Sequence, residues 1–256
     1  MPPDATALPL RHALALGALH GVAELWPVSS SAHVALVPRL AGWSDVTALP
    51  ADVRKAFEVA LHAGTLPVLV ALTPLPAWRV ALAATVPAAV VGLLWERPIE
   101  RRLGGEQTVA VGLVAGSCAM LAADARGGTE RRAADAGLRD ALVLGAAQAV
   151  ALMPGTSRLG MTLTAARALG FARRDALQLA HAAGLPVIAA ATALKLWRLG
   201  RGGLDPQLRA PFAAGMAAAF ATSALAGRRT RGVSVPAVAA ERFGLAALAL
   251  RAQRRR

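Results

Sequence analysis

The chain has few charged and few aromatic residues, a single cysteine, and no tyrosine or asparagine at all. The lone Cys118 excludes a small secreted domain held together by disulfides. Only 17% of the 256 residues are charged, whereas 55% are hydrophobic. Water-soluble domains carry about 25% charged residues, so this chain has too little polar surface to cover itself in water. The same apolar content excludes intrinsic disorder.

Long windows without any Asp, Glu, Lys or Arg indicate the class of protein. Each window is close to the ~20 residues that a helix needs to cross the hydrocarbon core of a bilayer. Five of these windows, with their flanking residues, and the mostly apolar segment 233–250 lead us to expect six full membrane spans, at residues 57–73, 80–95, 107–123, 176–197, 210–227 and 233–250. Because the charged residues gather between these windows, the sequence predicts an all-α polytopic membrane protein. Residues 1–256 are expected to form one integral-membrane domain.

The formal net charge of +13 does not by itself indicate a nucleic-acid partner. Only Lys55 and Lys195 are lysines among the 28 basic residues, and the chain is very rich in alanine and arginine, as biased base composition would produce. Basic loops that face anionic lipid headgroups explain the charge. We therefore expect a lipid bilayer and no nucleic acid as the partner.

Two stretches of the first half recur in the second half in the same order. Residues 16–30 match residues 144–157 with a gap opposite Glu24, and residues 62–68 match residues 181–187. Each match contains a proline. These matches indicate an internal duplication, with repeats at about residues 10–123 and 138–250.

Residues 13–42 and 141–171 differ from ordinary membrane spans, because each runs from apolar residues into Pro27 or Pro154 and then into Ser and Thr. Proline ends a helix, and Ser or Thr caps the next one. Such broken helices are tolerated at membrane depth only where protein or a wet cavity surrounds them. We predict two re-entrant helix hairpins. With three spans per half the number of crossings is odd, which predicts inverted repeats whose broken loops meet near the midplane.

The first broken segment carries residues that are typical of catalytic sites. His20 and Glu24 are four positions apart, so they share one helical face and can hold a metal ion. Ser30 and His33 are three positions apart on the following helix, which predicts a nucleophile beside its base.

The second broken segment adds hydroxyls and an arginine at the start of a helix. A helix N-terminus attracts anions, and Arg158 is a bidentate phosphate donor. Together with the carboxylate, the serine and the histidine, this predicts binding or hydrolysis of a phosphate at membrane depth. For Ser29 and Ser31 a helix-capping role is an equal alternative. The hydroxyls expected to bind phosphate are Ser29, Ser31, Thr156, Ser157 and Thr162.

At these motifs the chain resembles the undecaprenyl-diphosphatase family, the bacitracin-resistance proteins of bacterial inner membranes. Residues 24–33 are similar to its E-x-x-P-V-S-S-[ST]-[GA]-H motif, and residues 154–162 are similar to its P-G-x-S-R-S-G-x-T motif. Residues 57–65 are similar to its F-E-V-x-x-Q-x-G-S stretch, and residues 236–243 lie where its last helix carries a similar pattern of Pro and Arg-Phe. The resemblance covers about residues 10–250.

The resemblance implies a multi-pass inner-membrane enzyme that hydrolyses undecaprenyl diphosphate to undecaprenyl phosphate and so recycles the lipid carrier of cell-wall synthesis. It implies Ser30 as nucleophile, His33 as its base or acid, and Arg158 as the clamp on the diphosphate. Glu24 would act on a water molecule or on a divalent cation, Mg²⁺ or Ca²⁺. Whether serine, histidine or activated water is the nucleophile stays open at this point.

The chain departs from the family at His20, where Glu is usual, at His62, where Gln is usual, and at Leu159, where Ser is usual. A cation site with one carboxylate fewer favours Mg²⁺ or Ca²⁺ less, although imidazole ligates softer metals. These changes bear on catalytic competence more than on the fold.

A transporter or flippase for a polyprenyl phosphate is the alternative function, with little or no phosphatase activity. An inverted repeat and anion-binding helix ends serve transport without any turnover. Phosphate release by the purified protein separates the two functions. A homodimer is a further expectation that the sequence does not fix.

Overall fold

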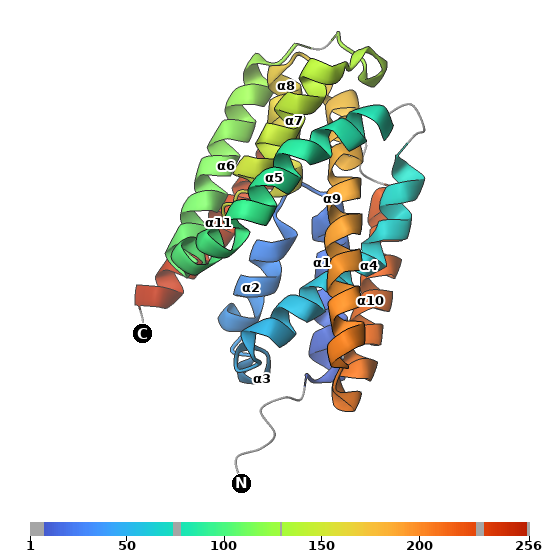
Figure 1. The fold of residues 1–256 in the computed structure, drawn as a ribbon. Coiled ribbons are helices and arrows are strands. Elements are labelled where there is room, and N and C mark those ends of the chain that lie inside the picture. Colours follow the sequence, from blue (N-terminus) through green and yellow to red (C-terminus); the bar gives the residue numbers. More distant parts are fainter. Residues whose placement is uncertain (1–7, 74–77, 129, 229–232, 255–256) are drawn as a thin grey trace.

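The broken segments form pairs of helices in the computed structural model, which describes residues 8–73, 78–128, 130–228 and 233–254 (Figure 1). Pro27 and Pro154 lie in the breaks, as predicted, because proline lacks the N–H that would continue the helix. Ser29 and Ser157, which precede the second helix of each pair, have φ of 78° and 69°. The paired helices are α1 (Leu10–Leu25) with α2 (Ser30–Leu40), and α7 (Leu138–Val150) with α8 (Arg158–Ala168).

Ser29 and Ser157 are the two non-glycine residues with positive φ in the described part of the chain. A side chain in that conformation costs of order 1–3 kcal/mol, and such strain persists only where the surroundings enforce it. Ser29 lies at the first break and Ser157 at the second. Other parts of the structure must therefore hold both breaks in place.

A helix forms at each of the six predicted spans. Five of them are long and apolar enough to cross a membrane, namely α4, the Trp78–Trp95 part of α5, α6, the Arg173–Leu194 part of α9, and α10. The last helix carries Glu241 and Arg242 in its middle, which lowers its hydropathy. The six helices are α4 (Ala51–Leu72), α5 (Trp78–Leu103), α6 (Glu106–Arg126), α9 (Arg173–Gly202), α10 (Pro206–Gly227) and α11 (Val235–Arg254). Two short helices, α3 (Ser44–Thr47) and the 3₁₀ helix η2 (Ala133–Asp135), lie in connections.

Helices of each half pack against helices of the other half. Helix α1 packs on α10 of the second half, and α7 packs on α5 of the first half. Helix α4 likewise contacts α10, and α9 contacts α5, while α6 lies beside α11 at one edge of the bundle (Figure 1). Corresponding helices of the two halves thus make corresponding contacts, as expected of two related repeats. The inverted orientation of the repeats stays a prediction.

Glycines let α1 approach α10 closely. A Cβ added to Gly17 would collide with the backbone of Gly215, and one added to Gly21 would collide with the Thr222 side chain. Small residues at helix interfaces are common in membrane proteins, because they let backbones come into van der Waals contact. This contact fixes α1, and with it the position of the break.

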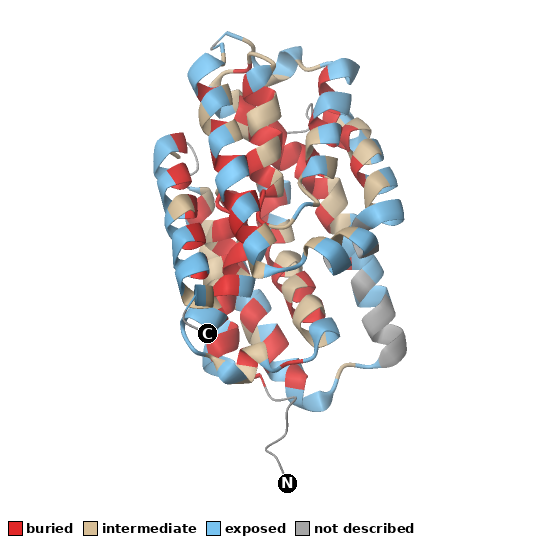
Figure 2. Cartoon of the chain, turned by 90° about the vertical axis from the view of Figure 1, so that its left-hand side faces the viewer, coloured by how far each residue is buried: buried red, intermediate tan, exposed pale blue. Residues whose placement is uncertain are grey.

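The outer faces of the bundle expose large apolar side chains. Leu93 is 83% exposed and Leu82 60% exposed on α5, and Leu225 on α10 is 63% exposed. Figure 2 shows exposed residues around the periphery of the bundle and buried ones inside it. Apolar surface of this kind is unfavourable in water and favourable against lipid tails. The surface and the five apolar helices make this a multi-pass membrane protein.

The connection between the halves is held by Arg131. Its guanidinium donates to both carboxylate oxygens of Asp140, with N–O distances of 3.0 and 2.8 Å, and lies 4.1 Å from the centre of the Phe171 ring. The hydrogen bond from Arg131 holds the pKa of the Asp140 carboxyl below its usual range. The start of α7 is thereby tied to the end of α8.

Candidate active site

One buried arginine joins the two broken loops. The Arg242 side chain is fully buried, and its Nη1 donates to the Pro27 carbonyl of the first loop at 3.0 Å. Its Nη2 donates to the carbonyls of Gly155 and Thr156 in the second loop, at 3.1 and 2.9 Å. The predicted meeting of the loops is therefore confirmed, and α11 supplies the residue that connects them.

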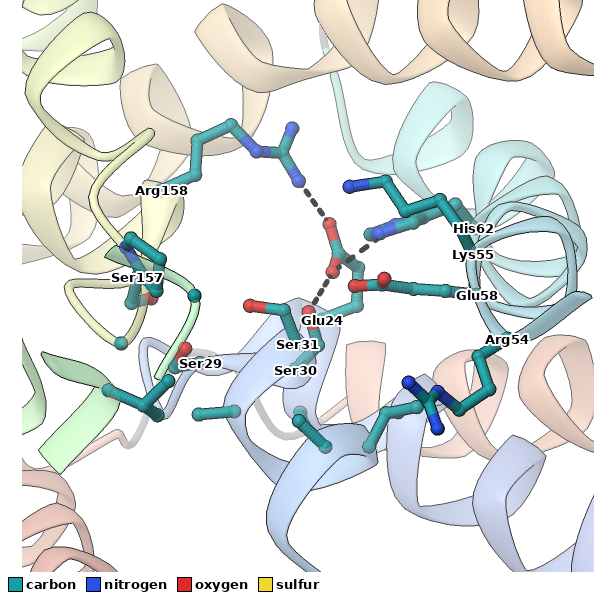
Figure 3. Close-up of a pocket in the computed structure, with 18 of the residues that line it drawn as sticks. Glu24, Ser29, Ser30, Ser31, Arg54, Lys55, Glu58, His62, Ser157 and Arg158 are labelled. Carbon is teal, nitrogen blue, oxygen red and sulfur yellow. Dashed lines mark hydrogen bonds and ion pairs between the residues drawn. The ribbon is translucent and has the colours of Figure 1, made fainter. Parts of the chain in front are cut away.

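A cavity of about 770 Å³ lies beside the joined loops (Figure 3). Polar side chains from three segments face it: the break between α1 and α2, the break between α7 and α8, and the first half of α4. Apolar residues from α1, α2, α4 and the second break form much of the rest of the wall. The labelled polar lining residues are Glu24, Ser29, Ser30, Ser31, Arg54, Lys55, Glu58, His62, Ser157 and Arg158.

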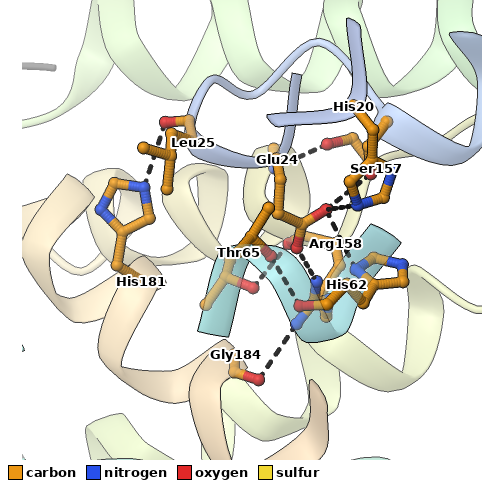
Figure 4. Close-up of polar contacts among 12 residues, drawn as sticks. His20, Glu24, Leu25, His62, Thr65, Ser157, Arg158, His181 and Gly184 are labelled. Atoms are coloured by element: carbon orange, nitrogen blue, oxygen red, sulfur yellow. Dashed lines mark hydrogen bonds and ion pairs between the residues drawn. The ribbon is translucent and has the colours of Figure 1, made fainter. Parts of the chain in front are cut away.

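Glu24 is the centre of the polar contacts (Figures 3 and 4). Its side chain is 4% exposed, and Arg158 Nη2 donates to its Oε1 at 2.5 Å. The Ser30 hydroxyl donates to its Oε2 at 2.6 Å. Arg158 is fixed in turn, because its Nη1 donates to the Gly184 carbonyl at 3.0 Å. A buried carboxylate is tolerated only with such partners.

This arrangement can activate a hydroxyl. A carboxylate that accepts a hydrogen bond from a serine can also accept its proton when the serine oxygen attacks an electrophile. The Arg158 side chain is 23% exposed and lines the cavity, so guanidinium N–H groups beyond those bonded to Glu24 and Gly184 are available to an anion. Ser30, Glu24 and Arg158 therefore bring a nucleophile, a base and an anion donor to one place.

The expected pairing of Ser30 with His33 is wrong for this structure. His33 Nδ1 donates to the Ser29 carbonyl at 2.8 Å, and His33 Nε2 lies 2.8 Å from Oε1 of Glu241 on α11. Ser30 and His33 do share one face of α2. Each has a carboxylate nearby that is a stronger hydrogen-bond partner, because the carboxylate is charged: Glu24 for Ser30 and Glu241 for His33. His33 is also absent from the described residues that line the cavity.

Three of the five predicted phosphate-binding hydroxyls bond to the backbone instead. Ser157 Oγ caps α8 by accepting from the Gly160 N–H at 3.1 Å. Thr156 and Thr162 each donate to a carbonyl of their own segment at 2.7 Å. The cavity is lined by Ser29, Ser31 and Ser157 and not by the two threonines, among the residues described.

His20 and His62 lie together beside Glu24 (Figure 4). Their rings are 4.4 Å apart between centroids and nearly perpendicular, at 85°. Glu24 Oε2 lies 3.9 Å from His20 Nε2 and 3.5 Å from His62 Nδ1. One ligand atom from each of the three residues lies within 4.8 Å of the other two, so they form a group that could hold a metal ion.

The donor set of this group does not fit Mg²⁺ or Ca²⁺. Those ions prefer six or more oxygen ligands, whereas His20, His62 and Glu24 offer two nitrogens and one carboxylate. The cation that the family resemblance implies is thus not matched by these side chains.

Sequence reasoning missed Glu241 and Arg242 as parts of the site. A signal was present, because they are adjacent charged residues in the middle of an otherwise apolar segment, and such residues are costly in a membrane. His181 Nε2 donates to the Leu25 carbonyl at 3.1 Å, which ties α9 to the end of α1. Leu159 packs into the largest apolar cluster and also lines the cavity.

Comparison with known proteins places the chain in a family. Residues 13–75 and 71–230 match the family described as bacitracin resistance protein BacA. The undecaprenyl-diphosphatase of Geobacter sulfurreducens is 38% identical over 85% of this chain and 86% of its own length. That of Pelobacter propionicus is 37% identical over 83% of this chain and 84% of its length. The chain belongs to the bacitracin resistance protein BacA family.

Proposed function

We propose that this protein hydrolyses undecaprenyl diphosphate to undecaprenyl phosphate and inorganic phosphate in a bacterial inner membrane. The observation that carries the proposal is the Glu24 carboxylate, held between the Arg158 guanidinium and the Ser30 hydroxyl where the two broken helices meet. The relatives named undecaprenyl-diphosphatase support the same reaction. That name also disfavours the transporter alternative.

The cavity suits both parts of such a substrate. Arg158 and the N-termini of α2 and α8 offer N–H groups to a terminal phosphate, and Arg54 adds positive charge on the α4 side. Leu16, Phe57 and other apolar lining residues offer a surface for the first isoprene units. The rest of the lipid tail would lie against the apolar outer faces of the helices.

The contacts of Ser30 suggest a covalent route. Its Oγ attacks the terminal phosphorus while Glu24 takes the hydroxyl proton, and the bond from that phosphorus to the bridging oxygen breaks. Undecaprenyl phosphate leaves with the bridging oxygen, to which Glu24 passes the proton that it took from Ser30. Water then attacks the phosphorus of the phosphoserine, and the bond between phosphorus and Oγ breaks. Glu24 carries one proton of that water to Oγ, which releases phosphate and restores the hydroxyl. Arg158 shifts its hydrogen bonds from Glu24 to the phosphoryl oxygens, where charge gathers in the transition state.

His33 takes no direct part in this route, and it acts as a positioning residue. It holds the Ser29 carbonyl through Nδ1 and is itself held by Glu241, so it fixes the strained residue that precedes Ser30. Its place outside the cavity lining disfavours histidine as the nucleophile.

Phosphate release from undecaprenyl diphosphate by the purified protein in detergent tests the proposal. We expect Ser30→Ala and Arg158→Ala each to lower turnover by at least ~100-fold, the usual effect of losing a nucleophile or an electrostatic clamp. Ser223→Ala is the matched control, because this buried hydroxyl on α10 bonds only the Phe220 carbonyl of its own helix among the described contacts.

Each outcome separates the alternatives. Near-normal turnover in Ser30→Ala would replace the covalent route by direct attack of water. Near-normal turnover in Arg158→Ala would refute the assignment of this cavity as the active site. A wild-type protein that binds the lipid without releasing phosphate would favour transport.

A further inference from the structure

We propose that His20, Glu24 and His62 form a binding site for a first-row transition metal of the Zn²⁺ or Co²⁺ type. The site is formed by two helices, because His20 and Glu24 lie one turn apart on α1 and His62 faces them from α4 (Figure 4). The assignment goes beyond the proposed hydrolysis, and its test needs no substrate.

The three ligand atoms lie close to the geometry that such an ion requires. With bonds of 2.0–2.1 Å in a tetrahedral site, ligand atoms lie about 3.3 Å apart. Glu24 Oε2 is 3.9 Å from His20 Nε2 and 3.5 Å from His62 Nδ1. All three ligand atoms lie within 4.8 Å of one another, so movements of about 1 to 1.5 Å would bring them to the separation that a tetrahedral ion requires.

His20 is the residue that most clearly points to a ligand. It is fully buried, and neither of its ring nitrogens has a hydrogen-bond partner among the described residues. Nδ1 of His62 likewise lacks one, although it faces Glu24. Leaving a buried polar group without a partner is destabilising, so two imidazoles of this kind beside one carboxylate are better accounted for if they share a ligand.

Glu24 retains capacity for a metal despite its other contacts. A carboxylate offers about four lone-pair sites. Arg158 uses one on Oε1 and Ser30 uses one on Oε2, which leaves one on the oxygen that faces both histidines. The carboxylate would also offset part of the charge of the cation.

The donor chemistry selects the class of ion. Two imidazoles and one carboxylate suit Zn²⁺, Co²⁺ and related ions, whereas Mg²⁺ and Ca²⁺ prefer oxygen. Three protein ligands leave a fourth position open, as in catalytic zinc sites. Glu24 and His62 line the cavity, so that position would face the space where a phosphate oxygen or water binds.

Titration with Co²⁺ tests the site directly, because its visible ligand-field absorption reports nitrogen and oxygen ligands around the ion. The protein is purified without a polyhistidine tag and stripped with EDTA. We expect one Co²⁺ per chain, displaced by Zn²⁺ and unaffected by an excess of Mg²⁺ or Ca²⁺. Binding should be weakened in His20→Gln and in His62→Gln by more than the roughly 10- to 100-fold that loss of an outer-shell partner costs.

Glutamine is the suitable replacement at both positions. Gln148 is the counterpart of His20 in the second repeat and is buried there, so the fold accepts the amide, and His62 is only partly buried. His12→Gln is the control, because His12 lies 3.0 Å from Asp45 on another helix, so it tests whether any histidine beside a carboxylate attracts the ion. Thermal unfolding shows whether each variant is folded.

Four results would overturn the assignment. They are the absence of stoichiometric Co²⁺ in the wild type, full binding in both His20→Gln and His62→Gln, loss of binding only in His12→Gln, and displacement of Co²⁺ by Mg²⁺ or Ca²⁺ at equal concentration. If one of the two site variants fails to fold, the other decides the question by itself.

Discussion

Replacing Arg242 by methionine would remove the guanidinium that joins the two broken loops while keeping a side chain of similar length. Three buried carbonyls, those of Pro27, Gly155 and Thr156, would lose their donors. Each loss costs about 1–3 kcal/mol. Removing a buried charge returns several kcal/mol of desolvation cost, so the expected net destabilisation is about 3 kcal/mol.

Thermal unfolding in detergent measures this effect, and phosphate release measures its consequence. For a chain of this size, ~3 kcal/mol corresponds to a fall in Tm of roughly 6–12 °C. Turnover should fall as well, since the loops carry Ser30 and Arg158. Arg251→Met is the control, because Arg251 is exposed and lies on the opposite face of α11. An unchanged Tm together with normal phosphate release in Arg242→Met would refute the role of Arg242 in holding the two loops together.

Two further predictions concern residues that position the site. Glu241→Gln keeps a hydrogen-bond partner for His33 but removes its charge, so kcat should fall roughly three- to tenfold, the equivalent of ~1 kcal/mol, with KM unchanged. A raised KM at normal kcat would instead indicate a contact with substrate. Gly184→Ala would place a Cβ 2.9 Å from Arg158 Nη1, so KM for the diphosphate should rise while Tm holds or rises, since alanine favours the helix. Gly92→Ala, which faces open space, is the control, and an equal change in KM there would contradict the steric explanation.

The sequence by itself determined the helices and their breaks. The length of a window without charged residues can be read directly from the sequence. Proline alone does not mark a break, because Pro67 and Pro186 lie inside α4 and α9. The local signal for a break is a proline followed two positions later by Ser or Thr, which can cap the next helix. The pairs α1 with α2 and α7 with α8 therefore lie where Pro27 and Pro154 predict them. The motifs also predicted that Glu24, Ser30 and Arg158 would come together, although His33 of the same motif does not join them.

Only the tertiary structure decided which partner each side chain has. Residue spacing places His33 on the face of Ser30, yet its partner is Glu241, which is 208 positions away. In the same way, His20 gains His62 as a neighbour because α4 packs against α1. Arg242 bonds to both loops because α11 passes the place where they meet. Such contacts depend on helix packing across the whole chain, and helical periodicity carries no information about them.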